Sequence, residues 1–233
     1  MRTRRFYNPF ANLNKFEWLL WLASLLVVTL GFFLGGRMGV ISYVASLLGV
    51  TALIFIAKGD VTGHFFVVFF ALLYGYVSWQ ERYYGEMLTY VCMSAPAGVV
   101  AIVSWIRHPF KEDGSEVAVN RLRGREWVFL CFLTALVTVI FYFLLGRFGT
   151  AQLWVSTVSV TTSFFASYLT FRRSPYYALA YSANDLVLIV LWLISAWRDP
   201  SYFSMVACFF MFLFNDLYGF FNWHRMQRRQ ERE

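Results

Sequence analysis

Eight apolar stretches, each about as long as a bilayer is thick, occupy most of this chain and constrain its fold more than any other feature. A helix needs about 20 mostly apolar residues to cross the hydrocarbon of a membrane. The composition agrees, because 59% of the residues are hydrophobic and only 14% are charged, whereas soluble domains average about 25% charged residues. We therefore predict an all-α integral membrane protein with eight transmembrane helices: Phe16–Leu34, Gly39–Ala57, Gly63–Trp79, Tyr84–Trp105, Glu126–Leu145, Thr150–Leu169, Tyr176–Trp197 and Tyr202–Trp223.

The basic residues lie mostly in segments that alternating spans place on one side of the membrane. With the amino terminus inside, all of the 20 Lys and Arg residues lie in cytoplasmic segments except Arg37, Arg82, Arg147 and Arg198. Cytoplasmic loops of membrane proteins carry such an excess, so both termini are predicted to be cytoplasmic. The net charge of +7 then indicates anionic lipid headgroups, and not nucleic acid, as the partner of the basic residues.

Sequence signatures of enzymes, metal sites and cofactor sites are absent. The chain contains no HExxH, GxSxG, phosphate-binding loop or glycine-rich dinucleotide turn. Its three cysteines all lie within predicted spans and lack the spacing of a disulfide framework or a metal site. We therefore expect no enzymatic activity, no cofactor and no metal.

The second half of the chain resembles the first when the sequence is shifted by 118 residues. Trp105 then aligns with Trp223, and Tyr74 aligns with Trp192. Each half contains an even number of predicted spans, so both halves enter the membrane in the same direction. Parallel repeats of this kind are typical of transporters that bind substrate between the repeats, near the midplane. The expected single membrane transport domain has a first half, a cytoplasmic linker and a second half, which are residues 1–106, 107–125 and 126–233.

An amide and a carboxylate, Asn184 and Asp185, lie in the middle of the seventh predicted span. A charge at that depth costs about 3 kcal/mol or more, so an ionisable residue there is a candidate functional group. Asp185 aligns with apolar Val67 of the first half, and it shares a helix face with Tyr181 and Trp192. We expect Asp185 to face a substrate cavity that Asn184 and Trp192 help to shape. The alternative is a structural carboxylate held by hydrogen bonds to neighbouring helices.

Polar residues also recur in the eighth predicted span. Asn215, Tyr218 and Asn222 share one helix face and are further candidates for substrate binding. Asn215 and Asn222 suit hydrogen bonds between helices equally well. Asp216 points to another face, nearer the cytoplasmic end, and we expect it to form a structural ion pair.

Three stretches carry a resemblance that extends over essentially the whole chain: YYGEM (Tyr83–Met87), FRRSPYYALAYSANDLVLIVLW (Phe171–Trp192) and FNDLYGFFNWHRM (Phe214–Met226). In these residues the chain resembles the PnuC family of bacterial nicotinamide riboside transporters. The resemblance implies a multi-pass protein of the bacterial cell membrane, with a SWEET-like three-plus-one-plus-three core and an extra N-terminal helix. It also implies facilitated uptake, trapping of the vitamin by cytoplasmic phosphorylation, and a homotrimer.

Nicotinamide riboside, the substrate that the resemblance implies, has a cationic ring, a carboxamide and a ribose. Aromatic faces and carboxylates attract cations, and amides and hydroxyls bind the remaining groups; the chain offers Asp185, Trp192, Asn184, Asn215 and Tyr218. The family often carries several Trp residues near the end of the span that matches Tyr84–Trp105, where this chain has one. Thiamine, also a cation, and neutral (deoxy)nucleosides are therefore alternative substrates, and a membrane receptor or scaffold is a more distant alternative.

The internal repeat predicts alternating access, in which two similar halves rock around a central site. The spans show no evident chain of carboxylates and histidines that could relay a proton. We therefore expect uncoupled carriage, with net accumulation supplied by the cytoplasmic trap.

Overall fold

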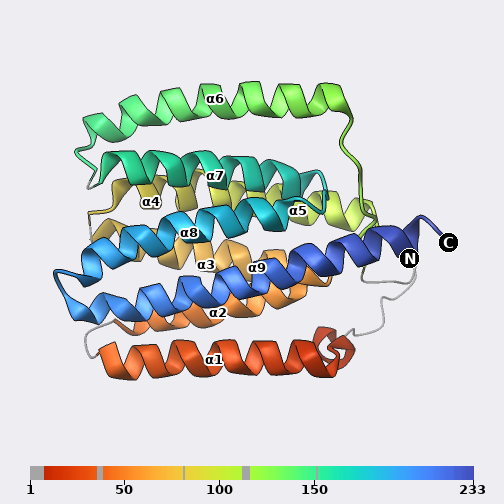
Figure 1. The fold of residues 1–233 in the computed structure, drawn as a ribbon, viewed down its shortest axis with the longest axis horizontal. Coiled ribbons are helices and arrows are strands. Elements are labelled where there is room, and N and C mark those ends of the chain that lie inside the picture. Colours follow the sequence, from red (N-terminus) through yellow and green to blue (C-terminus); the bar gives the residue numbers. More distant parts are fainter. Residues whose placement is uncertain (1–7, 36–38, 81, 112–115, 151) are drawn as a thin grey trace.

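The computed structural model describes residues 8–35, 39–80, 82–111, 116–150 and 152–233, and these fold into a bundle of long helices (Figure 1). The all-α prediction is confirmed for this part of the chain, and each predicted stretch coincides with one helical segment. The α-helices are α1 (Lys15–Gly35), α2 (Val40–Ala57), α3 (Thr62–Gln80), α4 (Tyr84–Leu88), α5 (Ala95–Arg107), α6 (Gly124–Arg147), α7 (Leu153–Phe171), α8 (Tyr177–Ala196) and α9 (Phe203–Gln230). Three short helices are η1 (Pro9–Asn12), η2 (Thr89–Ser94) and η3 (Pro200–Tyr202).

Seven helical segments within the described residues are long and apolar enough to cross a membrane. One of them, Tyr84–Arg107, combines α4, η2 and α5. The remaining helix, α7, has 19 residues and is less apolar because it is rich in Ser and Thr. Its hydroxyls bond to carbonyls one turn earlier, as Thr157 does to Leu153 and Thr170 to Ala166. This local pairing allows a hydroxyl-rich helix to be buried without unpaired donors.

Successive helical segments run in opposite directions, so the start of α1 and the end of α9 lie at the same end of the bundle (Figure 1). Most of the described Lys and Arg residues lie at this end, because they lie in or beside the first turns of α1 and α6, or in or after the last turns of α2, α5, α7 and α9. We call it the basic end. At the opposite end the described cations are Arg82, Arg147 and Arg198; Arg37 and the arginines of residues 1–7 lie outside the described residues.

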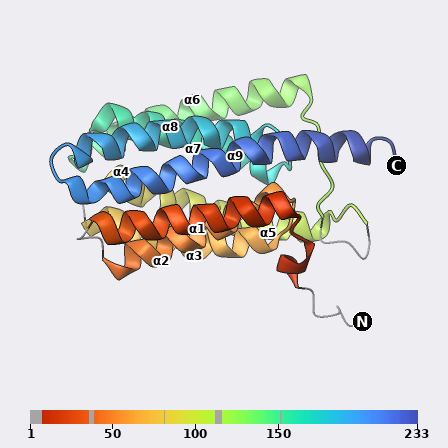
Figure 2. The ribbon, with the colours of Figure 1, turned by 60° about the horizontal axis from the view of Figure 1, so that its bottom comes forward.

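Six helical segments form a closed ring in which each packs against the next. The order around the ring is α2, α3, the α4–η2–α5 segment, α7, α8 and α9, and α9 packs against α2 again. Two helices lie outside the ring on opposite edges: α1 packs against α9 and α2, and α6 packs against α7 (Figures 1 and 2). Any chemistry at the centre of the bundle is therefore carried by the six ring segments.

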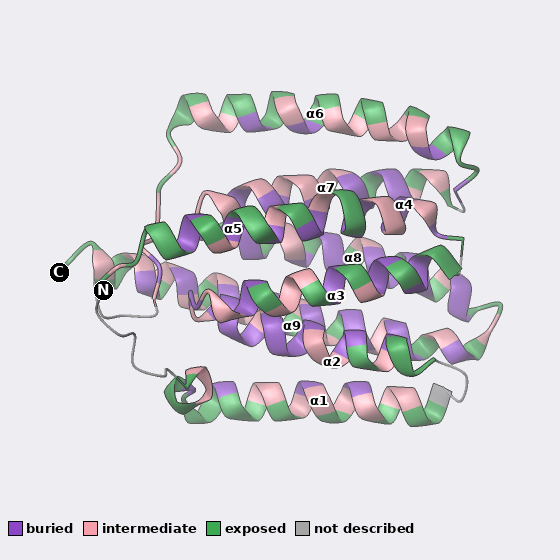
Figure 3. Ribbon diagram, turned by 180° about the vertical axis from the view of Figure 1, so that it is seen from behind, coloured by how far each residue is buried: buried purple, intermediate pink, exposed green. Residues whose placement is uncertain are grey.

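Helices α1 and α6 carry many exposed residues, as the view from behind shows (Figure 3), and large hydrophobic side chains are among them. Leu34 on α1 is 85% exposed, and Val128 and Phe132 on α6 are 71% and 67% exposed. A soluble protein rarely exposes such a continuous apolar surface. These faces are suited to contact with lipid tails.

A π-helical turn, η2, interrupts the fourth helical segment, which was predicted as one continuous helix. Pro96 follows it in the first turn of α5, where it supplies no N–H to the helix ladder. Single π turns inside α-helices frequently occur at functional sites. Here the turn places Tyr90 and Ser94 toward the interior of the ring.

The linker between α5 and α6 packs against the basic end where it is described. The Val117 N–H donates to the Gly59 carbonyl at 3.0 Å, and the Gln230 side chain donates to the Val117 carbonyl at 3.0 Å. Val117 itself is buried. The described part of the linker is thus fixed to the turn after α2 and to the end of α9.

The close packing of α2 on α3 can be tested at Gly63. A Cβ there would lie 2.6 Å from the Ala52 carbonyl oxygen and 2.8 Å from the Ile56 nitrogen, both backbone atoms. We expect Gly63→Ala to destabilise the protein by about 1–3 kcal/mol through overpacking, measured by thermal unfolding in detergent. Gly146→Ala is the matched control, because its Cβ meets only Leu153, at 3.9 Å, and alanine favours a helix. Equal unfolding temperatures for the two variants would contradict this packing.

Candidate functional site

A cavity lies at the centre of the six-segment ring, and all six segments line it. Helices α1 and α6 contribute nothing to its lining. Its volume is about 70 Å³, whereas pockets for small organic ligands measure about 300–1,000 Å³. The structure is therefore a contracted state, and the ring must open to admit a ligand of that size. The polar lining residues are His64, Tyr90, Ser94, Ser163, Ser167, Thr170, Tyr177, Tyr181, Asn184, Asp185 and Asp216.

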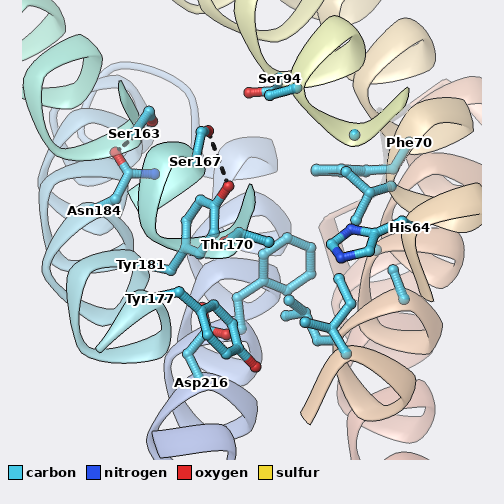
Figure 4. Close-up of a pocket in the computed structure, with 18 of the residues that line it drawn as sticks. His64, Phe70, Ser94, Ser163, Ser167, Thr170, Tyr177, Tyr181, Asn184 and Asp216 are labelled. Carbon is cyan, nitrogen blue, oxygen red and sulfur yellow. Dashed lines mark hydrogen bonds between the residues drawn. The ribbon is translucent and has the colours of Figure 1, made fainter. Parts of the chain in front are cut away.

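Asn184 lines this cavity from α8 and is oriented by hydroxyl groups of α7. Its Oδ1 accepts hydrogen bonds from Thr162 at 2.8 Å, Ser163 at 3.0 Å and Ser159 at 3.3 Å. Figure 4 shows the amide oxygen directed to Ser163 and the amide nitrogen directed away from it. Because the oxygen is held by three donors, the amide nitrogen is the group that Asn184 can offer to a ligand.

Tyr181 lies one turn before Asp185 on α8 and also lines the cavity. Its hydroxyl is 3.1 Å from that of Ser167 on α7 (Figure 4). His64 and Phe70 on α3 face it from across the cavity. The second-half helices thus supply most of the hydrogen-bonding groups, and the first-half helices supply mostly apolar and aromatic surface.

Asp185 on α8 and Asp216 on α9 both line the cavity, and both residues are buried. The expectation that Asp216 forms a structural ion pair is wrong, because the ion pairs of the described residues involve only glutamates. Asp216 is instead a cavity residue that the sequence analysis missed.

Trp192 does not line the central cavity. It is fully buried, and its Nε1 donates a hydrogen bond to the Tyr74 hydroxyl at 2.8 Å. It also borders a second hollow, at the end opposite the basic end, together with Asp199 and Tyr202. Trp192 therefore stands between the central cavity and that outer hollow.

Asn215, Tyr218 and Asn222 hold α9 against α1 and α2, and they lie outside the cavity lining. Asn215 donates to the Ser24 hydroxyl at 3.0 Å, and Asn222 donates to the Ala57 carbonyl at 2.8 Å. The Tyr218 hydroxyl donates to Glu17 on α1 at 2.7 Å. In this structure, then, all three side chains form interhelical hydrogen bonds.

Two pairs of aromatic residues that the 118-residue shift aligns are in contact in the bundle, one edge to face and one tilted. Tyr74 pairs with Trp192 at the outer side of the cavity, as described above. At the basic end the rings of Trp105 and Trp223 lie 5.4 Å apart, and both are buried. Each of these indoles donates to a backbone carbonyl of the other half, Trp105 to Thr170 and Trp223 to Ile56, at 3.1 and 2.9 Å. The cavity is closed at both ends by side chains that occupy equivalent places in the two halves.

The basic end of the cavity also carries a half-buried cation. Arg173, in the turn after α7, donates from Nη1 to the Ser104 hydroxyl at 2.8 Å and from Nε to the Ala118 carbonyl at 3.1 Å. Burial lowers the pKa of this guanidinium, and the neighbouring charge of Arg172 lowers it further. Arg173 therefore ties α5, the linker and the α7–α8 turn together just outside the Trp105 closure.

The residues that the sequence analysis missed had a partial signal. The Ser and Thr residues of α7 recur at helical spacing, which marks a polar face within an otherwise apolar span. Tyr90 and Ser94 had none, because the π turn that directs them inward cannot be recognised from their spacing.

Comparisons with known proteins point to a transporter family. A family model described as nicotinamide mononucleotide transporter matches residues 39–225. The nicotinamide riboside transporter PnuC of Haemophilus influenzae is 23% identical over 212 residues, which are 91% of this chain and 91% of that protein. The PnuC of Neisseria mucosa is 24% identical over 94% of this chain and 85% of the relative. A crystal structure of the vitamin B3 transporter PnuC matches with a TM-score of 0.84 at 24% identity and covers 95% of each chain, so the two share a fold.

The hydrogen bond between Trp192 and Tyr74 is expected to hold the outer closure shut. Tyr74→Phe leaves the Trp192 N–H buried without its acceptor, at a cost of about 1–3 kcal/mol. We expect about tenfold faster thiol labelling of an Ala97→Cys reporter in the cavity, in detergent and with the native cysteines replaced. Tyr43→Phe, which removes a hydroxyl 3.0 Å from Thr29 between α1 and α2, should leave the labelling rate unchanged. Equal rates in both variants would exclude a closing role for this bond.

Proposed function

Because the chain belongs to the PnuC family of membrane transporters, whose family model covers residues 39–225, we propose that it carries nicotinamide riboside across the bacterial inner membrane. The observation that carries this proposal is the charge of the central cavity. Its lining includes two carboxyl residues, Asp185 and Asp216, and neither Lys nor Arg among the described residues. Such a cavity favours a cation, and the pyridinium ring of nicotinamide riboside carries a fixed positive charge.

The other lining groups suit the rest of that molecule. The free amide nitrogen of Asn184 can donate to the substrate carboxamide, and the Tyr181 hydroxyl can bond the ribose. Trp192 forms the outer closure that the substrate passes on its way to the cavity. Asn215, Tyr218 and Asn222 support the site by fixing α9, in place of direct substrate contact.

The proposed membrane arrangement has eight spans. Helix α7 is one of them, and its Ser and Thr hydroxyls make it less apolar than the other seven. Helices α2–α5 and α7–α9 form the two triplets of a SWEET-like core, α6 connects them, and α1 is the extra N-terminal helix. The closed ring and the contacts between shift-related aromatic pairs support this layout. The positive-inside rule places the basic end, and with it both termini, in the cytoplasm.

Two further parts of the proposal rest on the family resemblance. A cytoplasmic kinase traps the vitamin by phosphorylation, so that facilitated diffusion yields net uptake. The exposed apolar faces of α1 and α6 are available to lipid and to the other copies in a homotrimer.

Uptake into liposomes tests the function directly. Purified protein is reconstituted and offered radiolabelled nicotinamide riboside, thiamine and a deoxynucleoside in parallel. We expect saturable uptake of nicotinamide riboside above that of empty liposomes. Selective uptake of thiamine or of the deoxynucleoside would reassign the substrate, and no uptake of any compound would favour a receptor or scaffold.

The carboxylate of Asp185 is expected to contribute to affinity for the cation. Asp185→Asn keeps the shape and removes a charge, and we expect it to weaken nicotinamide riboside binding by about 1–3 kcal/mol, a loss of roughly tenfold or more in affinity. Calorimetry on detergent-purified protein measures this loss. Asp60→Asn is the matched control: this buried residue accepts from the Thr62 N–H at 2.9 Å and lies outside the cavity. Equal affinity in wild type and Asp185→Asn would reduce Asp185 to a structural residue.

A further inference from the structure

A groove at the basic end lies between the end of α5 and the turn that follows α7. Its volume is about 400 Å³, which is within the range of about 300–1,000 Å³ for pockets that hold small organic ligands. It shares no lining residue with the central cavity. The residues that line it are Val99, Val100, Val103, Ser104, Arg107, His108, Phe171, Arg172 and Arg173.

The groove is apolar along α5 and basic at its end. Val99, Val100 and Val103 line it from α5, where exposed positions recur (Figure 3), and they are 51%, 47% and 43% exposed. Arg107 ends α5, one to two turns further toward the basic end. The apolar part therefore lies at the depth expected of lipid tails, and the basic part lies at the level expected of headgroups.

The basic part of the groove carries charge that the described carboxylates leave unbalanced. Arg172 is paired with Glu126, since its Nη2 donates to Oε2 at 3.0 Å. Exposed Arg107 and half-buried Arg173 take part in none of the ion pairs of the described residues, and no described carboxylate lines the groove. Two guanidinium groups that border one groove repel each other, so an anion placed between them would be attracted to both.

Arg173 is also oriented for a ligand. As described above, its Nη1 and Nε donate to Ser104 and Ala118, which holds the side chain in one position. Its Nη2 makes no hydrogen bond within the described part of the chain. The planar guanidinium suits phosphate oxygens, with which arginine forms short, charge-assisted hydrogen bonds.

We propose that this groove binds one anionic phospholipid, whose phosphate lies between Arg107 and Arg173 and whose acyl chain lies along the valines of α5. A free phosphate would use the arginines alone, whereas a phospholipid also covers the exposed apolar surface beside them. Basic pockets between membrane helices on the cytoplasmic side are suited to lipid headgroups. The inference extends the general attraction of the basic end for anionic lipid to one defined site, and it requires no particular transported substrate.

The position of the groove gives the lipid a structural effect. Arg173 joins α5 to the α7–α8 turn through its bond to Ser104. The next residue, Trp105, donates to the Thr170 carbonyl and forms part of the closure at this end. A phosphate that binds both Arg107 and Arg173 would strengthen the same contact from outside. Binding of the lipid is therefore expected to stabilise the closed basic end and to raise the unfolding temperature of the protein.

Native mass spectrometry of the full chain in detergent tests the site without any substrate. The protein is titrated with phosphatidylglycerol, which is anionic, and with phosphatidylcholine, which has no net charge. We expect one phosphatidylglycerol to be retained per chain and phosphatidylcholine to bind at least about fivefold more weakly, since each arginine near a headgroup contributes about a factor of five. Inorganic phosphate at the concentration of the lipid should not displace phosphatidylglycerol. Equal retention of the two lipids, or displacement by inorganic phosphate, would overturn the proposal.

A pair of variants assigns the lipid to this groove. Arg107→Gln removes an exposed charge that forms no ion pair among the described residues, so the fold should be unaffected, and we expect affinity for phosphatidylglycerol to fall about fivefold. Arg228→Gln is the matched control: it removes an exposed charge of the basic end, on α9, that lies outside this groove. Its affinity should equal that of the wild type. Unchanged affinity in Arg107→Gln, or an equal loss in Arg228→Gln, would contradict the assignment.

Thermal unfolding gives an independent readout of the same site. Phosphatidylglycerol should raise the unfolding temperature of the wild type and of Arg228→Gln, and it should raise that of Arg107→Gln less. A rise of equal size in all three proteins would show that the lipid acts elsewhere on the surface and would overturn the proposal.

Discussion

The requirement that polar groups in a bilayer find partners within the protein governs how this chain is arranged, because hydrocarbon offers none. The two outer helices satisfy this requirement by exposing apolar faces, as α6 does with Val128 and Phe132. The six ring segments satisfy it by directing their polar residues toward one another. Asn184 shows the result most clearly, since three hydroxyls of α7 bond to its oxygen. The central cavity is therefore a consequence of polar groups that had to be placed away from lipid.

Residues that the 118-residue shift aligns form two aromatic pairs, Tyr74 with Trp192 and Trp105 with Trp223, near opposite ends of the bundle. Trp105 and Trp223 both direct an indole N–H to a carbonyl of the opposite half, so each half closes on the other in the same way. At the far side of the cavity, Trp192 of the second half donates one hydrogen bond to the side chain of Tyr74 in the first half. A cavity of about 70 Å³ between these pairs is too small for a riboside. Opening one pair while the other stays closed would give the alternating access that the repeat suggests, with few contacts changed at each step.

The sequence predicted those parts of the candidate site that follow from the pattern of a single helix. It did not predict the parts that depend on how two helices pack. Asn184, Asp185 and Tyr181 were found because a carboxylate at mid-span and the period of a helix indicate an inward face, and all three line the cavity. Asp216 was assigned to an ion pair because its position was judged along α9 alone. That Asp216 lines the same cavity as Asp185 depends on how α8 and α9 pack, and the sequence of α9 alone does not show this packing.

The other differences have the same origin. Trp192 shares a helix face with Asp185, but it lies two turns away along the axis, beyond the point at which Tyr74 closes the cavity. The inward direction of Tyr90 and Ser94 depends on the π turn of η2, which shifts the helical period locally. Tyr218 was counted as a candidate for substrate binding, yet it bonds to Glu17 because α1 packs on α9. Tyr74 and Glu17 are both far in sequence from the residues that they bond to.

The sequence by itself determined that the chain is helical and built for a membrane, because the length and polarity of each stretch are local properties that lipid selects directly. It also determined the basic end and the helix face on which Asp185 lies. Only the tertiary structure decided that six segments close into a ring, that Asp185 and Asp216 line one cavity, and that Tyr74 pairs with Trp192 and Trp105 with Trp223. These features depend on which helices become neighbours and at what height they cross, and such contacts between distant residues leave no trace in the composition or period of any single stretch.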